Sequence, residues 1–180
     1  MTYAEYKSNL PSRTAQDEDP VIADLITRVT GKSGAVSALY AQMANAPGLL
    51  EAYTSGYRSF AKESGFTPAE QQLIMLEISR FNGCTYCTWA HSAGARSAQV
   101  PEETIAAVMD QRQLDDVRLQ SLVSFVRTMV ATRGLPTSED SRRFLDAGYT
   151  EQQVLYIILA ISMKTITNYT SHIFHTQPSA

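Results

Sequence analysis

Apolar side chains recur every three or four residues along most of this 180-residue chain, the spacing that places them on one face of an α-helix. Runs that alternate between apolar and polar residues, which are typical of half-buried strands, do not occur at convincing length. We therefore expect an all-α protein. With Gly, Pro and capping residues as boundaries, the pattern predicts helices over residues 21–30, 36–46, 49–63, 67–80, 84–98, a short helix opening at 100–103, and then 115–133, 137–147 and 150–174.

The clearest start signal belongs to the helix that follows Ser64-Gly65-Phe66. Thr67 is placed as its N-cap, Pro68 as its first residue and Glu70 as the acid of a capping box. At the far end, Asn82-Gly83 interrupts the pattern, and we expect Asn82 to cap the next helix. The last predicted helix is apolar almost all round in its first half, so we expect it to be buried within the domain or against another subunit.

The length of the chain is most simply that of one domain, here residues 21–180, preceded by a polar arm over residues 1–20. A net charge of −3 and a pI near 5.6 argue against a nucleic-acid platform and against binding to an anionic membrane. Residues 1–20 lack the features of a signal peptide, and the longest apolar run, Val154 to Ile161, is too short to span a bilayer. These features predict a cytoplasmic protein with no nucleic-acid or membrane partner.

Both cysteines of the chain, Cys84 and Cys87, lie together with His91 in one stretch of eight residues. At about 100° per residue, a helix would present all three side chains on one face. In the cytoplasm a lone Cys-x-x-Cys is more typical of redox chemistry or metal binding than of a structural brace. A zinc site would lack an obvious partner motif, and two small buried cysteines are a further alternative. We favour a redox-active pair reachable from solvent, without a metal or cofactor.

Two arguments select different nucleophiles within this pair. Cys84, in the first turn of a helix, would gain thiolate character from unpaired backbone N–H groups and the helix dipole. Cys87 has His91 four residues later on the same face, where it can take the thiol proton. The residues alone leave the choice open.

The surrounding sequence resembles the carboxymuconolactone decarboxylase superfamily, specifically its alkylhydroperoxidase (AhpD-like) branch. The likeness extends over about residues 34–175. The segments that carry it are Phe66-Thr67-Pro68-Ala69-Glu70-Gln71-Gln72, Asn82-Gly83-Cys84-Thr85-Tyr86-Cys87 with Ala90-His91, the stretch from Ala147 to Leu155, and the stretch from Lys164 to His172.

This resemblance implies an all-α fold that assembles as a trimer or hexamer. It also implies that a thiol pair reduces a hydroperoxide and is recycled by an external dithiol or a thioredoxin-like reductant. In the AhpD-like pattern the second cysteine attacks the peroxide and the first resolves the sulfenic acid. That pattern would make Cys87 the nucleophile, Cys84 the resolving thiol and His91 a member of the proton relay.

The chain departs from this pattern at the relay acid. The AhpD-like glutamate twelve residues before the first cysteine is replaced by Gln72, which can orient His91 or bind a water but has no carboxylate to take up a proton. Glu77 is a candidate substitute, with a solvated surface acid as the alternative. Tyr86 stands where the family can have a histidine. Two other functions therefore remain open: a decarboxylase or isomerase acting on a small carboxylated lactone, and a non-catalytic thiol redox sensor.

A second set of polar residues follows the last predicted helix. Lys164, Asn168, Ser171 and His175 fall within an arc of about 60° on a largely apolar rod. We favour a solvated or subunit-facing stripe over a site for these four residues.

Overall fold

The computed structural model describes residues 3–31 and 36–178, and over these ranges every regular element is a helix. The predicted all-α fold is confirmed. The helices are α1 (Pro20–Thr30), α2 (Ala38–Met43), α3 (Pro47–Glu63), α4 (Pro68–Phe81), α5 (Thr85–Ser97), α6 (Glu102–Met109), α7 (Val117–Ala131), α8 (Ser138–Asp146) and α9 (Glu151–Phe174).

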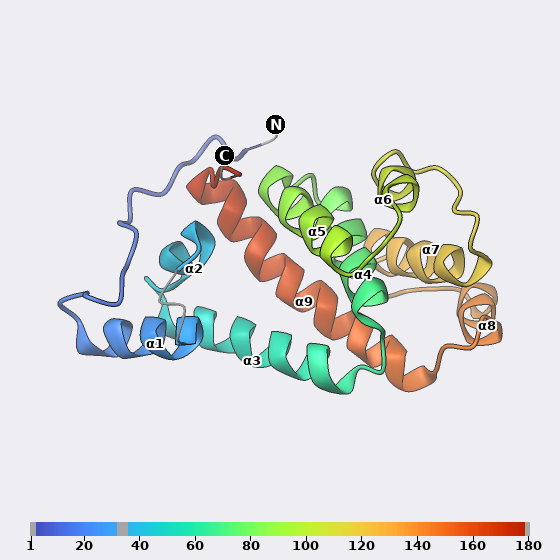
Figure 1. The fold of residues 1–180 in the computed structure, drawn as a ribbon, viewed down its shortest axis with the longest axis horizontal. Coiled ribbons are helices and arrows are strands. Elements are labelled where there is room, and N and C mark those ends of the chain that lie inside the picture. Colours follow the sequence, from blue (N-terminus) through green and yellow to red (C-terminus); the bar gives the residue numbers. More distant parts are fainter. Residues whose placement is uncertain (1–2, 32–35, 179–180) are drawn as a thin grey trace.

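The long helix α9 runs diagonally through the middle of the molecule (Figure 1). Helix α3 lies along one side of it with α1 and α2, while α4 and α5 lie along the other side, and α6, α7 and α8 lie beyond α4. The buried face of α9 includes Ile157, Ala160 and Met163, all in the main hydrophobic core. Helix α9 therefore connects the two sides of the fold, and any site between α5 and α9 lies near the centre.

Helix α4 begins as the sequence predicts. The Thr67 hydroxyl accepts a hydrogen bond from the Glu70 amide at 3.2 Å, and the Glu70 carboxylate accepts one from the Thr67 amide at 2.8 Å. Reciprocal capping of this kind satisfies two amides that the first turn of a helix leaves unpaired. The start of α4 fixes the register of the side chains that α4 later presents to α5 and α7.

The end of α4 corrects one prediction. Asn82 caps the C-terminus of α4 rather than opening α5. Gly83 follows with a φ of 68°, a left-handed conformation that glycine adopts without strain, and the Cys84 amide then closes the turn on the Ser79 carbonyl at 3.0 Å. Cys84, and not Asn82, is therefore the N-cap residue of α5.

The described part of the polar arm lies against the C-terminal end of α9. The amides of Ala4 and Ser8 donate to the carbonyls of His172 and Ile173 at 3.4 and 2.8 Å. The Tyr3 ring stacks on His175 with 4.8 Å between ring centroids. These contacts bring the two ends of the chain together, as Figure 1 shows. Residues 1–2 of the predicted arm lie outside the described residues, and the domain boundaries stay a prediction.

Helix α9 is only partly buried in the single chain. Leu155, Ile158 and Tyr169 are 66%, 46% and 59% exposed and share one face of the helix. This apolar stripe is the candidate contact surface for the predicted trimer or hexamer, and that assembly stays a prediction. Among the helices of the described residues, none is long and apolar enough to cross a membrane.

Candidate active site

The two cysteines lie side by side where α5 begins. The Sγ of Cys84 accepts the backbone N–H of Cys87 at 3.4 Å, and the two side chains hydrogen-bond to each other. Both are free thiols, with exposures of 0% for Cys84 and 2% for Cys87. The expectation that the thiols are open to solvent is therefore wrong for the single chain: the first turn of α5 is packed inside the core.

The surroundings place the negative charge of the pair on Cys84. The hydrogen bond from the Cys87 thiol, helped by Ser171, the Cys87 amide and the charge of Lys164, lowers the pKa of Cys84 to about 6 against the effect of burial. The same hydrogen bond and burial raise the pKa of Cys87. A thiol at the N-cap of a helix receives an amide that would otherwise be unpaired, which favours its charged form. The reduced pair thus holds one proton, on Cys87.

Three side chains of α9 surround the sulfurs, each one or two turns from the next. Lys164, Asn168 and Ser171 are 2%, 0% and 1% exposed. The prediction of a solvated or subunit-facing stripe is wrong for these residues, because the polar face of α9 is turned inward onto α5. His175, the fourth residue of that predicted stripe, lies at the end of the helix and donates from Nε2 to the Ala4 carbonyl at 2.9 Å.

The Asn168 amide is oriented by a neighbouring asparagine. Asn82 donates from Nδ2 to the Asn168 Oδ1 at 2.8 Å. The Nδ2 of Asn168 and the Oγ of Ser171 are buried, and neither has a nitrogen or oxygen partner among the described residues. The Asn168 group lowers the pKa of Cys87 and the Ser171 group that of Cys84. Helix α9 therefore directs a polar group at each sulfur.

His91 connects Gln72 to Lys164. Its Nδ1 lies 3.0 Å from the Gln72 Oε1, and its Nε2 lies 2.9 Å from the Lys164 Nζ. An amide oxygen can only accept, so Nδ1 carries the proton and Nε2 accepts from Lys164. Burial, and then the charge of Lys164, lower the pKa of His91 well below its usual value. The imidazole is therefore neutral, and both of its ring nitrogens are occupied.

This arrangement changes the relay that the sequence predicts. His91 was expected to take a proton directly from Cys87, but its free electron pair is directed at the Lys164 ammonium. Lys164 in turn hydrogen-bonds to the Cys87 side chain. The chain of contacts from the sulfurs is thus Cys87, Lys164, His91 and Gln72. Gln72 orients the imidazole, which is one of the two roles that the sequence allows it.

A glycine of α5 makes room for the Gln72 amide. A Cβ atom at Gly94 would collide with the Oε1 of Gln72. A helix with glycine in its middle is less stable than one with alanine by roughly 1 kcal/mol. Gly94 therefore lets Gln72 reach His91 at some cost to the stability of α5.

Glu77 does not belong to this site. Its carboxylate is fully buried and accepts from Arg80 at 2.6 Å and from Arg127 of α7 at 2.7 Å. Both sequence-based interpretations are corrected: the side chain is not a surface acid, and it points away from the relay toward α7. Glu77 follows Gln72 by five residues on α4, about 140° further around the helix, so the two side chains face different neighbours.

Tyr86 forms part of the wall around the sulfurs. It is 9% exposed, and its ring lies 5.8 Å from that of Trp89, which is 43% exposed. Burial raises the pKa of Tyr86, while a hydrogen bond with Ser37 opposes the shift. Tyr86 thus contacts Ser37, the N-cap residue of α2, and lines the site beside the thiols.

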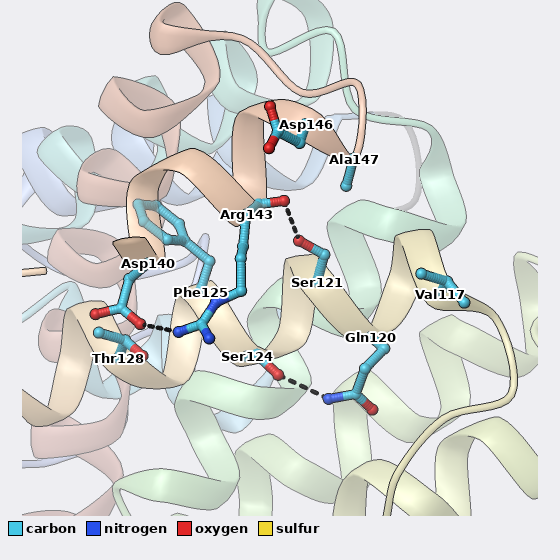
Figure 2. Close-up of a pocket in the computed structure, with 10 residues that line it drawn as sticks. All are labelled: Val117, Gln120, Ser121, Ser124, Phe125, Thr128, Asp140, Arg143, Asp146 and Ala147. Carbon is cyan, nitrogen blue, oxygen red and sulfur yellow. Dashed lines mark hydrogen bonds and ion pairs between the residues drawn. The ribbon is translucent and has the colours of Figure 1, made fainter. Parts of the chain in front are cut away.

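One hollow of the surface lies away from the thiols. A cavity of about 630 Å³ opens between α7 and α8 (Figure 2). Its polar side chains bind one another: Arg143 pairs with Asp140 at 2.7 Å and Gln120 donates to Ser124 at 2.7 Å. None of the thiol-site residues lines it. In residues 3–31 and 36–178, no group of three His, Cys, Asp or Glu side chains could hold a metal ion.

Residues 47–116 match the model of the carboxymuconolactone decarboxylase family. This segment carries α3 to α6, and with them Gln72, both cysteines and His91. The superfamily resemblance inferred from the sequence is confirmed. Lys164 and the rest of α9 lie outside the matched segment. No curated protein matches the chain.

Solved structures share the fold over nearly the whole chain. A peroxidase-related protein from Ralstonia eutropha JMP134, described as an alkylhydroperoxidase AhpD core, has a TM-score of 0.82 at 20% identity and covers 98% of this chain and 94% of its own. A peroxidase-related protein from Silicibacter sp. TM1040 has a TM-score of 0.75 at 21% identity, covering 96% and 95%. The debrominase Bmp8 has a TM-score of 0.76 at 15% identity, covering 96% and 94%. The fold is therefore AhpD-like.

Proposed function

We propose that this protein is a thiol-dependent oxidoreductase that reduces small hydroperoxides, with Cys87 as the nucleophile and Cys84 as the resolving thiol. The observation that carries the proposal is the contact between the two buried sulfurs, one charged and one protonated, beneath the polar face of α9. The AhpD-like fold supports it. Because Cys87 is only 2% exposed beside Tyr86, the substrate has to be small.

The thiolate on Cys84 acts first as a base. The Cys87 thiol donates its hydrogen bond to Cys84, so a proton moves between the sulfurs over that one bond and leaves Cys87 as the thiolate. The Cys87 sulfur attacks the distal oxygen of the hydroperoxide, the O–O bond breaks, and the alkoxide takes up a proton to leave as an alcohol. Cys84 then attacks the Cys87 sulfenic acid, which forms the disulfide and releases water.

An external dithiol closes the cycle by thiol–disulfide exchange and is itself oxidised to a disulfide. The overall reaction converts one hydroperoxide and one dithiol into an alcohol, water and a disulfide. A thioredoxin-like protein or a small dithiol in the cytoplasm is the proposed reductant.

The test is mass spectrometry of the reduced protein after one equivalent of hydroperoxide. We expect the wild type to lose two hydrogen atoms as the disulfide forms, Cys84→Ser to gain one oxygen on Cys87, and Cys87→Ser to remain unmodified. Turnover with a dithiol should vanish in Cys87→Ser. An oxygen found on Cys84 in Cys87→Ser would reverse the two roles, and unchanged turnover in that variant would refute the nucleophile assignment.

Cysteine variants also test the other candidate functions. Decarboxylation or isomerisation of a carboxylated lactone needs no thiol pair, so activity retained in a Cys84→Ser/Cys87→Ser protein would favour it. A structure of a Bmp8 debrominase variant contains 2,3,4-tribromopyrrole, and a bromopyrrole therefore belongs in the substrate panel. A reversible disulfide without turnover of any of these compounds would favour a thiol redox sensor.

A further inference from the structure

Lys164 is a buried cation at the thiol site, and no carboxylate of the described residues pairs with it. It is 2% exposed in the middle of α9, and its Nζ lies 2.9 Å from the His91 Nε2. Burial lowers the pKa of Lys164, and the sulfurs of Cys87 and Cys84 partly offset that effect. A buried ammonium is unstable unless it is paired and hydrogen-bonded. The counter-charge of Lys164 is therefore the thiolate of the pair.

The other polar groups near the sulfurs are poor sources of a proton. His91 is neutral because its pKa is lowered, and Gln72 carries an amide. The phenols of Tyr53 and Tyr86, which face the thiols from α3 and α5, have raised pKa values because they are buried. Asn168 and Ser171 can donate hydrogen bonds but do not ionise near neutral pH. Within residues 3–31 and 36–178, the ammonium of Lys164 is thus the one cationic acid in contact with the reacting atoms.

We propose that Lys164 is a catalytic residue, which stabilises the thiolate of the reduced pair and then protonates the oxygen that leaves when Cys87 attacks. This inference rests on the proposed function and gives the proton donor for it. The acid role falls to a residue of α9 that contacts the Nε2 of His91. Gln72, which stands where the AhpD-like pattern has its glutamate, contacts the Nδ1.

The proton and charge balance of this step closes. Before the reaction the pair carries one negative charge and one proton, and Lys164 carries one positive charge. Cys87 attacks after its proton has moved to Cys84, and the alkoxide takes a proton from Lys164, which becomes a neutral amine. When Cys84 closes the disulfide, its proton leaves with the hydroxide of the sulfenic acid as water. The products are a neutral disulfide, a neutral lysine, an alcohol and water.

Disulfide formation also makes the loss of this proton favourable. The disulfide carries no charge, so the interactions that raise the pKa of Lys164 disappear while burial still lowers it. Reduction by a dithiol restores the thiolate and, with it, the reason for Lys164 to bind a proton. The charge of Lys164 therefore follows the redox state of the cysteines.

The first test is a titration of the thiolate by its ultraviolet absorbance in the reduced protein. We expect a midpoint near the pKa of about 6 for Cys84 in the wild type. In Lys164→Met the midpoint should move upward by about one pH unit, the lower end of the usual effect of removing a neighbouring opposite charge, because other groups also hold the pKa of Cys84 down. Lys62→Met, at an exposed lysine of α3, is the matched control and should titrate like the wild type. An unchanged midpoint in Lys164→Met would overturn the proposal.

The second test separates charge from proton transfer. Lys164→Arg keeps a positive charge but cannot release its proton near neutral pH, so its thiolate midpoint should stay low. Its single-turnover rate with hydroperoxide should nevertheless fall about a hundredfold, the lower range for loss of a general acid. A rate equal to that of the wild type would overturn the acid role. Circular dichroism of each variant confirms that the helices are intact.

The outcomes distinguish this inference from the proposed function. If the wild type reduces no hydroperoxide, the proposed function fails, and the acid role fails with it. The thiolate titration still decides whether Lys164 stabilises the charged pair. If the wild type turns over and Lys164→Met titrates and reacts like it, only the role of Lys164 is refuted.

Discussion

Two groups of buried charges lie on different faces of α4, and they are built in opposite ways. On the face toward α7, the Glu77 carboxylate binds the guanidinium groups of Arg80 and Arg127. On the face toward α5, Gln72 contacts His91, which contacts Lys164, whose counter-charge is a thiolate. The first group is paired through carboxylate and guanidinium groups, which take no part in redox chemistry. The second is paired by a charge that disappears on protonation or oxidation.

The difference separates a structural cluster from a reactive one. Arginine stays protonated at any pH at which the protein is folded, so the Glu77 cluster keeps its charges whatever the redox state. A thiolate with a pKa of about 6 is lost as the pH falls through that value. The thiol site should therefore lose its charge pair in mild acid.

The strongest way to test this comparison is Glu77→Gln. The substitution leaves two partly buried guanidinium groups without their acid, so the free energy of unfolding should fall by about 3 kcal/mol. The thiolate midpoint should stay where it is in the wild type. Urea unfolding and the ultraviolet titration measure the two quantities.

Glu103→Gln is the matched control for that experiment. Glu103 pairs with Arg112 at an exposed site, 72% and 47% accessible, where an ion pair contributes less than about 1 kcal/mol. If Glu77→Gln destabilised the protein no more than this control, or shifted the thiolate midpoint, the two clusters would not be separate.

Gly94→Ala sharpens the comparison on the side of the thiol site. A Cβ at this position collides with the amide of Gln72, the far end of a flexible and only partly buried side chain, which can move aside. The free energy of unfolding should therefore change by less than about 1 kcal/mol, because the better helix propensity of alanine offsets the displacement. Peroxide turnover should fall, because His91 loses its orienting partner. Gly48→Ala, with open space around the added Cβ, should be neutral or stabilising by up to about 1 kcal/mol and should leave turnover unchanged. Equal turnover in the two variants would contradict the orienting role of Gln72.

Asn82→Ala has the smallest expected effect on the thiol site. It removes the hydrogen bond that orients Asn168, which should lower the free energy of unfolding by about 1 kcal/mol. Asn168 lowers the pKa of Cys87 and not that of Cys84, so the thiolate midpoint should stay where it is, while peroxide turnover should fall because the Cys87 thiolate is less well stabilised. Asn45→Ala removes hydrogen bonds with Arg13 and with the carbonyls of Pro11 and Gln42, and should destabilise the protein at least as much without changing turnover. Unchanged turnover in Asn82→Ala would show that Asn168 needs no orientation from Asn82.

The elements of the fold could be predicted because their signals are local. Thr67, Pro68 and Glu70 mark the start of α4 through contacts within one turn. The mistake at Asn82 arose because an asparagine before a glycine fits both the end of one helix and the start of the next. Only the positive φ of Gly83 decides between them, and that conformation depends on how α4 and α5 pack.

The partners of the thiols could be predicted only in part. Cys84, Cys87 and His91 were found together because they share one helix, whereas Lys164 comes from α9, 73 residues after His91. The signal for Lys164 was present: a lysine, an asparagine and a serine at helical spacing on an otherwise apolar rod. The sequence could not show which way that face turns, because the rotation of α9 depends on its packing against α3, α4 and α5. Glu77 was misplaced for the same reason.

The position of Cys84 at the cap of α5 has a consequence for the shape of the reduced and oxidised protein. The sulfur that carries the charge also receives the amide of Cys87, so the beginning of this helix is secured by an electron-rich atom. Once that atom is bonded to the second sulfur, it accepts hydrogen bonds less well, and the opening turn loses its anchor. Oxidation should thus loosen the backbone at the very place where a reductant has to reach the disulfide.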